Sequence, residues 1–514
     1  MTESHKKPLQ NIQILRDLKT AAMATEDFFR ARLDQMIDLS HPLAVLARRM
    51  PWSQIEVALA PYFARAPRAG CSQQVQDWFG TRVQVAGGGV SAAGRPRLPI
   101  RLMAALLYLK HAFNLSDEEL VQRWSENVVW QYFSGQEYYS PKLPCDATQI
   151  GRFRVAIGEA GVEELLKASI DTAVQTKAVQ PSEFERVIVD TTVQEKAVAH
   201  PVDSRLLEVA RSQLVKAAQA VGIGFKQTYA KECKQLRRKA GGYAHARQYK
   251  RLRKVLKRQR TILGITVRWV QRHLKAISHS AAAHLQERLQ TVLASATRVH
   301  TQRPKDKNKL YAMHAPEVEC IGKGKARKPY EFGVKAAVVV THAHGLMVGV
   351  RTFPGNPYDG HILDAQLEQT NILLEDVGVK PNTAIVDLGF RGKLAEHHNP
   401  GIEIIHRGKF KQLTQEQRRW LRRRQAVEPA IGHLKADHGM DRCWLKGQVG
   451  DAIHAVLCAA GYNLRWLMRA VVRLGLKDFF ARFFISAFLT WLACASQAMR
   501  YLQKRPDDEK LLMA

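Results

Sequence analysis

Two short apolar runs that each end in an aspartate constrain the fold of this chain more than any other feature. Residues 187–189, Val-Ile-Val, lead into Asp190, and residues 384–386, Ala-Ile-Val, lead into Asp387. Runs of this kind predict buried strands of a sheet. A carboxylate in a buried strand is costly unless a cation meets it, so the sequence predicts two neighbouring strands that bring two carboxylates together.

Two interpretations of this pair are open at this point. In the first, a divalent cation neutralises both carboxylates, because hard ions such as Mg²⁺ bind carboxylate oxygens and bridge phosphates. In the second, each aspartate caps a turn at the end of its strand. A third acid favours the first interpretation, since Glu428 lies in a helical run with Arg424 and Lys435 on the same face. Taken alone, that run is equally an exposed helix with an Arg424–Glu428 ion pair.

The hydrophobic period changes along the chain and indicates the fold class. Residues 1–180 have mostly helical periodicity, whereas residues 330–340 alternate with period two and a second strand follows after a turn. A helix near 361–375, strands in 383–390 and 402–408, and a helix from about Gln415 come next. The order of these elements predicts a mixed α/β sheet.

Residues 98–135 predict two helices joined by a short turn. The first helix breaks at Asn114, and Ser116 precedes Glu119 by three residues, as in a capping box. Such a pair can dock in a DNA groove, but packed helix pairs are common and the second helix begins with acidic residues. Residues 87–97, rich in glycine, predict a loop or linker.

Most of the positive charge lies in one segment. Residues 204–300 hold 22 lysines and arginines against 3 glutamates and no aspartate, a net +19 of the chain's +31. Apolar residues recur there at helical spacing, which predicts amphipathic helices with a basic face and a break at Gly241 and Gly242. Solvated faces usually mix charge signs, so this face predicts contact with nucleic acid. The cations expected to make that contact are Arg251, Arg253, Lys254, Lys257 and Arg258.

Composition argues against several other classes. The N-terminus lacks the apolar core of a signal sequence, and the apolar run 479–495 is short for a membrane span and contains Arg482. We expect a packing helix there and no membrane partner. The 7 cysteines are scattered without a CxxC pair, which argues against a disulfide framework or zinc ribbon and predicts a reducing, cytoplasmic compartment. The loop "GKGKARK", 322–328, lacks Walker spacing, so no ATP is expected.

Three sequence blocks resemble the DDE transposases of the IS5 family of bacterial insertion sequences. "DTTVQEKAVAHP" resembles the block around the first catalytic aspartate, and "VDLGFRG" resembles the block around the second, although Leu388 stands where an arginine or lysine is common. "RRRQAVEPAIGHLK" resembles the signature Y-(2)-R-(3)-E-(6)-K, with Leu421 in place of its tyrosine. The likeness covers about residues 95–470.

The resemblance implies a ribonuclease-H-like catalytic core in which the first and fourth strands are neighbours. It also implies that a basic helical insertion interrupts this core and that a mostly helical region for DNA binding and dimerisation precedes it. The expected boundaries are 1–180 for the helical region, 181–203 and 311–475 for the core, 204–310 for the insertion, and 476–514 for a C-terminal helical tail.

The resemblance implies that Asp190, Asp387 and Glu428 are catalytic and hold two Mg²⁺ or Mn²⁺ ions. The implied chemistry is cleavage of DNA by water at the end of an insertion sequence, followed by attack of the freed 3′-hydroxyl on target DNA. No covalent protein intermediate is expected. The implied setting is the bacterial cytoplasm, at the nucleoid.

DNA is the expected partner, both as element ends and as target, with the protein as a homodimer or larger assembly on it. The residues expected to position phosphates are Arg424 and Lys435, with the loop cations Lys323, Lys325, Arg327 and Lys328 as a backbone clamp. Two alternatives remain: a nuclease on the same core that cuts without joining, and a DNA-binding relative that has lost catalysis. The intact acid triad argues against the second.

Overall fold

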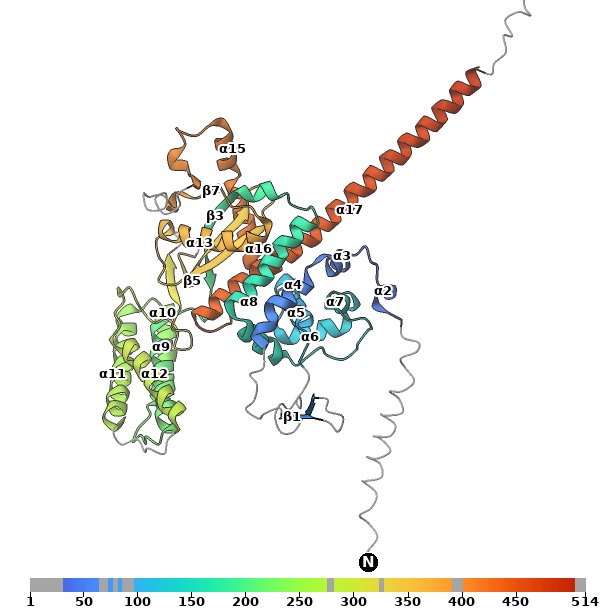
Figure 1. The fold of residues 1–514 in the computed structure, drawn as a ribbon. Helices are drawn as coiled ribbons and strands as arrows, with labels where there is room; N and C mark the ends of the chain where they lie inside the picture. The colour runs from blue at the N-terminus through green and yellow to red at the C-terminus, as the bar shows by residue number, and fades with distance from the viewer. Residues whose placement is uncertain are drawn as a thin grey trace, which may run out of the picture.

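The computed structural model describes residues 31–63, 73–76, 82–85, 97–274, 282–322, 328–390 and 401–503, with backbone alone at 73–76, 82–85 and 476–503. Figure 1 shows a body built from a sheet and an N-terminal helical region, with a separate bundle of helices on one side and a long C-terminal helix.

The described part of the N-terminal region is mostly helical, as its periodicity predicts. Its helices and the hairpin that interrupts them are α2 (Leu33–Met36), α3 (Pro42–Arg49), α4 (Trp52–Leu59), η2 (Ala60–Phe63), β1 (Gln73–Gln76), β2 (Arg82–Val85), α5 (Ile100–Ala112), α6 (Asp117–Glu126), α7 (Val128–Phe133) and α8 (Ala147–Gln175). The hairpin was not expected. Most of the glycine-rich stretch 87–97 lies outside the described residues.

The predicted helix pair is present as α5 and α6. Asn114 ends the first helix with φ of 51°. The Ser116 side chain then accepts a hydrogen bond of 3.0 Å from the backbone N–H of Glu119, which caps α6. Residues 102–109 of α5 are all buried, so α5 is a core helix and contributes no groove-binding face of its own.

The sheet has six strands, and its topology confirms the predicted mixed α/β fold. They are β3 (Arg186–Glu195), β4 (Glu319–Gly322), β5 (Tyr330–Thr341), β6 (Met347–Phe353), β7 (Thr383–Ile385) and β8 (Glu403–Ile405). The order is β4-β5-β3-β7-β8, with β6 also paired to β5. β6, β5 and β3 are antiparallel neighbours, whereas β7 is parallel to β3 and β8 to β7. This arrangement agrees with a ribonuclease-H-like core; the short strand β4 was not expected.

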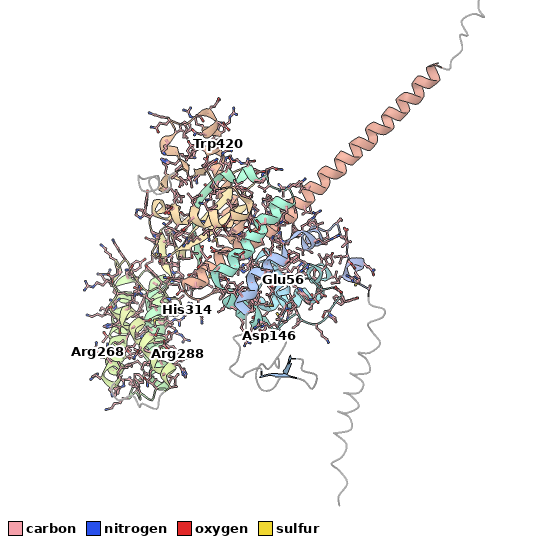
Figure 2. All side chains as sticks on the ribbon, viewed as in Figure 1. Glu56, Asp146, Arg268, Arg288, His314 and Trp420 are labelled. Atoms are coloured by element: carbon pink, nitrogen blue, oxygen red, sulfur yellow. The ribbon has the colours of Figure 1, made fainter. Side chains whose placement is uncertain are left out.

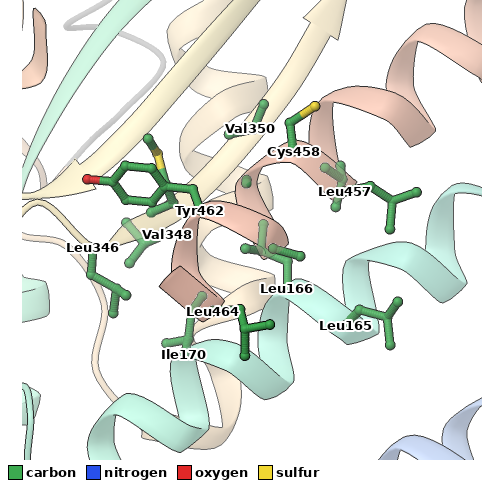
Figure 3. Packing of buried hydrophobic residues seen from close by; sticks show 14 of the residues in the cluster. Leu165, Leu166, Ile170, Leu346, Val348, Val350, Leu457, Cys458, Tyr462 and Leu464 are labelled. Carbon is green, nitrogen blue, oxygen red and sulfur yellow. The ribbon is translucent and has the colours of Figure 1, made fainter. Parts of the chain in front are cut away.

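Helices cover the sheet and link it to the N-terminal region. α13 (Asp359–Leu373) packs on β6, and α17 (Gly447–Gln503) packs on β6, α8 and α5. Figure 3 shows Leu457, Tyr462 and Leu464 of α17 packed beside Leu166 of α8 and Val348 of β6. One continuous hydrophobic cluster therefore holds the helical region against the six-stranded sheet.

The basic segment forms four helices between β3 and β4. These are α9 (Asp203–Ala220), α10 (Ala230–His245), α11 (Tyr249–His273) and α12 (Ala283–Thr301), which we call the four-helix unit. Its hydrophobic cluster is separate from that of the sheet. Figure 2 labels Arg268 and Arg288 on this unit, and His314 where the chain returns to the sheet.

The predicted break at Gly241 and Gly242 is wrong, because both lie inside α10. Glycine weakens a helix by only about 1 kcal/mol, so packing can outweigh it. Here Cys233 and Ala240 of α10 are buried, and α10 packs against α9 and α11. The helix instead ends at His245, before Arg247 with φ of 55°.

The long helix α17 continues to Gln503, and Figure 1 shows its C-terminal part extending beyond the body. The predicted packing of residues 479–495 concerns side chains outside the described ones. In the part of the chain that the structure describes, no helix is both long and apolar enough to cross a bilayer.

Candidate active site

Asp190 and Asp387 lie at the same level of two adjacent parallel strands. The register pairs Val187 with Ala384 and Ile188 with Ile385, and each aspartate comes two residues after the last pair. The predicted adjacency of the two strands is therefore confirmed. Asp190 lies within β3, which continues to Glu195, so it does not cap a turn at a strand end. Asp387 does precede a turn, since its carbonyl accepts from the Phe390 N–H.

The Arg424 guanidinium contacts both carboxylates. Its Nη1 is 3.2 Å from Oδ2 of Asp190, and its Nη2 is 3.8 Å from Oδ1 of Asp387. The Arg424 and Asp190 side chains are 11% and 18% exposed, whereas that of Asp387 is 51% exposed. The backbone N–H of Thr191 donates to Oδ1 of Asp190 at 2.8 Å, which fixes that carboxylate. A cation between the aspartates offsets the repulsion that their adjacency creates.

A short turn between two helices places Arg424. α15 (Gln415–Arg423) ends just before it, the 3₁₀ turn η8 (Arg424–Ala426) carries it, and α16 (Val427–Ala436) follows. α16 packs against β3 through its buried residues Val427 and Leu434. The single helical run predicted for Arg424, Glu428 and Lys435 is therefore divided between two elements, with Arg424 in η8 and the other two residues in α16.

α15 is anchored to the sheet next to this turn, at the end of β3 and β5 where Arg186 and His342 lie. Arg423 Nε donates to the carbonyl of His342 at 2.7 Å, and the ring Nε2 of His342 lies 3.3 Å from the carbonyl of Trp420. The Arg186 guanidinium stacks 3.5 Å from the centroid of the Trp420 ring. These contacts, none of which follows from sequence spacing, join α15 to β3 and β5.

Burial lowers the pKa of His342 to about 4, although its contact with the Trp420 carbonyl acts in the opposite direction. The positive charges of Arg186 and Arg423 lower this pKa further. The imidazole is therefore neutral at pH 7. The contacts that anchor α15 to the sheet then include two cations, Arg186 and Arg423, rather than three.

Glu428 and Lys435 occupy different surroundings on α16. Glu428 is exposed in the first turn of the helix, four residues after Arg424. The Lys435 ammonium lies 3.5 Å from Oε2 of Glu331, a β5 residue whose side chain is 5% exposed. Lys435 thus offsets a buried carboxylate, a role that the sequence did not indicate.

The segment after Asp387 packs closely against the N-terminus of α13. A Cβ on Gly389 would lie 2.7 Å from Oδ2 of Asp359, so a larger residue here would force the Asp359 carboxylate to move. Asp359 is itself held by Lys335, whose Nζ is 2.9 Å from its Oδ1. This close approach gives a physical reason for the glycine in "VDLGF" and fixes the chain just beyond Asp387.

Of the remaining cations predicted to contact DNA, the described ones lie on α11 and at Lys328. All five cations expected on the basic face are exposed on α11: Arg251, Arg253, Lys254, Lys257 and Arg258. Arg258 is paired with Glu232 at 2.7 Å. Lys328 is paired with Glu195, the last residue of β3, at 2.6 Å. The other three loop cations, Lys323, Lys325 and Arg327, lie outside the described residues.

The acidic side chains fit a hard divalent cation. Asp190 and Asp387 offer carboxylate oxygens at one level of the sheet, and their contact with Arg424 shows that this position attracts a cation. Glu428 is an exposed carboxylate one helical turn from Arg424. Carboxylate oxygens with access to water are the ligands that Mg²⁺ takes in phosphoryl-transfer sites.

Two family models match the chain. Residues 31–156 match a transposase domain (DUF772), and residues 288–464 match a transposase DDE domain. The second match includes Asp387, Arg424, Glu428 and Lys435 but begins after Asp190. An uncharacterised protein, ORF8 in the nfe locus of Rhizobium meliloti, is 42% identical over 223 residues, which is 43% of this chain and 95% of that protein. No solved structure matches the chain.

Proposed function

The two matched domains make this chain a DDE transposase, and on that premise we propose that it cleaves the ends of an IS5-family insertion sequence and joins them to target DNA. The active site of this proposal consists of Asp190, Asp387 and Glu428. The observation that carries it is the contact of Arg424 with both aspartates, 3.2 Å and 3.8 Å away, on adjacent parallel strands.

In this proposal the three acids hold two Mg²⁺ or Mn²⁺ ions. When bound, such ions supply Lewis-acid chemistry, which activates the attacking oxygen and stabilises the leaving one. Asp190 is oriented for ligation by the Thr191 N–H, and Asp387 by the close packing of Gly389 on Asp359. The rigid strand and turn would hold both carboxylates in place for in-line attack.

Arg424 has a second role in the proposed reaction. Once the carboxylate charges are neutralised, its guanidinium no longer has to offset them and can pair with a phosphate of the strand to be cut. The neighbouring α16 would present Glu428 to the same phosphate region. Lys435 acts less directly, because its ammonium is already paired with Glu331.

The four-helix unit supplies the proposed surface for the DNA backbone. The five exposed cations named above all lie on α11, and the segment 204–300 contains few acidic residues. Such a surface favours phosphate contacts, which give affinity without base specificity.

The experiment that tests this function compares two acid variants with a control. Asp387→Asn and Glu428→Gln each remove a charge and a ligand oxygen while keeping the side-chain shape. We expect both to bind a duplex made from the DNA flanking the coding region, and to lose Mg²⁺-dependent cleavage and joining by at least about 100-fold.

Asp364→Asn is the matched control, because Asp364 is an exposed aspartate on α13. It should cleave and join as the parent does. Cleavage without any joined product in the parent would make the protein a nuclease. Parent-like cleavage by Asp387→Asn or Glu428→Gln would show that the three-carboxylate assignment is wrong.

A further inference from the structure

A buried cluster of His111, His454 and Cys458 joins α5 to α17, among residues that take no part in the proposed catalysis. His111 is 3% exposed, His454 is 8% exposed and Cys458 is fully buried. His454 and Cys458 are four residues apart on α17, so they share one face of the helix. α5, which carries His111, packs directly on α17. Figure 3 shows Cys458 in the packed layer beside Leu457.

The distances in this cluster fit a zinc site. The Cys458 Sγ is 3.6 Å from Nδ1 of His111 and 3.6 Å from Nε2 of His454. Zn–S and Zn–N bonds of about 2.3 and 2.05 Å at a tetrahedral angle place sulfur and nitrogen about 3.5 Å apart. All three ligand atoms lie within 4.8 Å of one another. Two nitrogens bound to one tetrahedral zinc are about 3.35 Å apart, so the two imidazoles would have to approach each other by at most about 1.4 Å.

A cavity of about 590 Å³ adjoins the cluster. His111 and His454 line it, together with polar residues that include Asp441 and Asn114. Water from this cavity can supply a fourth ligand, which three protein ligands leave open.

Two backbone carbonyls adjoin the cluster. One of them competes for a proposed ligand atom, because an Nε2 of His454 that binds zinc cannot also donate to Gly439. The His111 carbonyl lies 2.9 Å from Nδ1 of His438, and the Gly439 carbonyl lies 2.9 Å from Nε2 of His454. Without a metal, the His454 N–H would donate to Gly439 and the Cys458 thiol to His111. The cluster would then be a hydrogen-bonded core without an ion, and this is the alternative that an experiment must exclude.

We propose that His111, His454 and Cys458 bind one Zn²⁺ ion that fastens the N-terminal helical region to α17. A thiolate with two imidazoles favours zinc over the hard ions that carboxylates bind. His111 lies in the residues matched by the first transposase model, and the other two lie in those matched by the second. The ion is therefore a clamp between the two matched regions, chemically distinct from the Mg²⁺ proposed at the aspartates.

The test measures metal bound to the full-length protein, purified with a tag that contains no histidine and dialysed against a metal-scavenging resin. Elemental analysis should find about one zinc per chain. Cys458→Ser and His454→Gln should each reduce this to near zero. Cobalt replacing zinc should give a thiolate-to-cobalt charge-transfer band in the parent, and Cys458→Ser should lack it.

Two control variants test whether the bound zinc lies at this cluster or elsewhere in the protein. Cys443→Ser removes another buried cysteine, and Asp387→Asn disrupts the proposed catalytic site; both should keep one zinc. Cys458→Ala provides a second, smaller replacement, and circular dichroism shows whether each variant is folded. A folded parent that retains no zinc and gives no cobalt band would overturn the proposal. Folded Cys458 variants that keep the zinc and the cobalt band would also overturn it.

Discussion

Arg424 occupies the position between Asp190 and Asp387 where a divalent cation would compete with it. Its guanidinium is mostly buried and lies within 3.8 Å of both carboxylates. A buried cation next to two acids lowers their mutual repulsion, and a metal ion at the same acids would do so more strongly. If the two aspartates bind a metal as proposed, Arg424 would stabilise the metal-free protein and lower its affinity for that metal.

The first prediction follows from this competition. Arg424→Gln leaves the two carboxylates without a cation, so the metal-free protein should lose thermal stability and Mg²⁺ or Mn²⁺ should restore it. The rise in Tm on adding MnCl₂, measured by differential scanning fluorimetry, should be larger for Arg424→Gln than for the parent. DNA cleavage should fall in the same variant.

Arg422→Gln is the control, because Arg422 is an exposed arginine two positions earlier on α15. Its MnCl₂-dependent rise in Tm should equal that of the parent. An equal rise in all three proteins would mean that Arg424 and the metal do not share the aspartates.

At the residue scale, sequence pattern predicted the adjacency of Asp190 and Asp387 because strand burial leaves a strong local signal. It did not predict that Asp190 lies inside β3 rather than at its end, since strand ends depend on pairing partners. The contact of Arg424 with both acids and the pairing of Lys435 with Glu331 were also missed. Both depend on the tight turn η8 and on residues more than a hundred positions away.

At the element scale, two sets of contacts attach the α15–α16 segment to the sheet. The first set joins α15 to the ends of β3 and β5. It is made by Arg423 and Trp420 of α15 with His342, and by the stacking of Arg186 on Trp420. At the other end Lys435 joins α16 to Glu331 of β5. Arg424 and Glu428 lie between these two attachments, so either one can position them.

The second prediction concerns pH at His342. Its folded pKa of about 4 lies below the unfolded value near 6.5, so the folded state favours the neutral imidazole. Stability is then fully present above pH 6.5 and is progressively lost as pH falls from about 6.5 to 4. His342→Gln cannot gain this charge, so its Tm should fall less than that of the parent between pH 7.5 and 5.

The matched control is His314→Gln, which alters an exposed histidine and should reproduce the parent's pH dependence. If His342→Gln lost as much Tm on acidification as the parent, protonation of this anchor would not limit acid stability.

The third prediction separates two roles of Lys435. Lys435→Met leaves Glu331 as a buried, unpaired carboxylate, which should lower the unfolding free energy by about 2 kcal/mol after allowing for partial exposure of the lysine. Adding Glu331→Leu should restore most of this stability, as chemical denaturation would show. Cleavage that recovers with stability would give Lys435 a structural role, whereas persistent loss would show that its charge acts on DNA.

Prediction at the element scale was good for strands and helices with strong periodicity and poor where packing overrides local preference. The helix α10 continues through Gly241 and Gly242 because its buried side chains pack on its neighbours. The short strand β4 has too few residues for alternation to be recognised, and it forms because Glu319–Gly322 pairs with β5.

At the scale of the whole molecule, the four-helix unit is a charged module with its own hydrophobic cluster, attached between two strands of the catalytic sheet. The net charge of +19 over residues 204–300 was evident from composition, and the helices of this unit from periodicity. Their arrangement as a separate bundle, seen in Figure 1, required the tertiary structure.

The fourth prediction tests this unit as a DNA-binding surface. Replacing Arg251, Arg253, Lys254, Lys257 and Arg258 with glutamine should weaken binding to all DNA sequences. The slope of log affinity against log salt should flatten by about 0.9 for each DNA phosphate that the variant no longer neutralises. Arg258 is paired with Glu232, so reverting this one residue should change the slope least.

A control variant removes exposed cations from outside both the N-terminal region and the four-helix unit, namely Lys380, Arg442, Lys446, Arg465 and Arg473. Binding isotherms at several salt concentrations should give it a slope close to that of the parent. Equal flattening in both variants would mean that net charge alone, and not the surface of α11, determines DNA affinity.

Metal-specific rescue at Asp387 tests most directly whether this aspartate ligates a catalytic metal. Asp387→Cys replaces a carboxylate with a thiolate, a soft ligand that binds Mg²⁺ poorly and Mn²⁺ better. If Asp387 ligates a catalytic metal, this variant should fail to cleave element-end DNA in Mg²⁺ and regain cleavage in Mn²⁺, while Asp387→Asn should remain inactive in both. Parent-like cleavage by Asp387→Cys in Mg²⁺ would show that Asp387 does not ligate a catalytic Mg²⁺ ion.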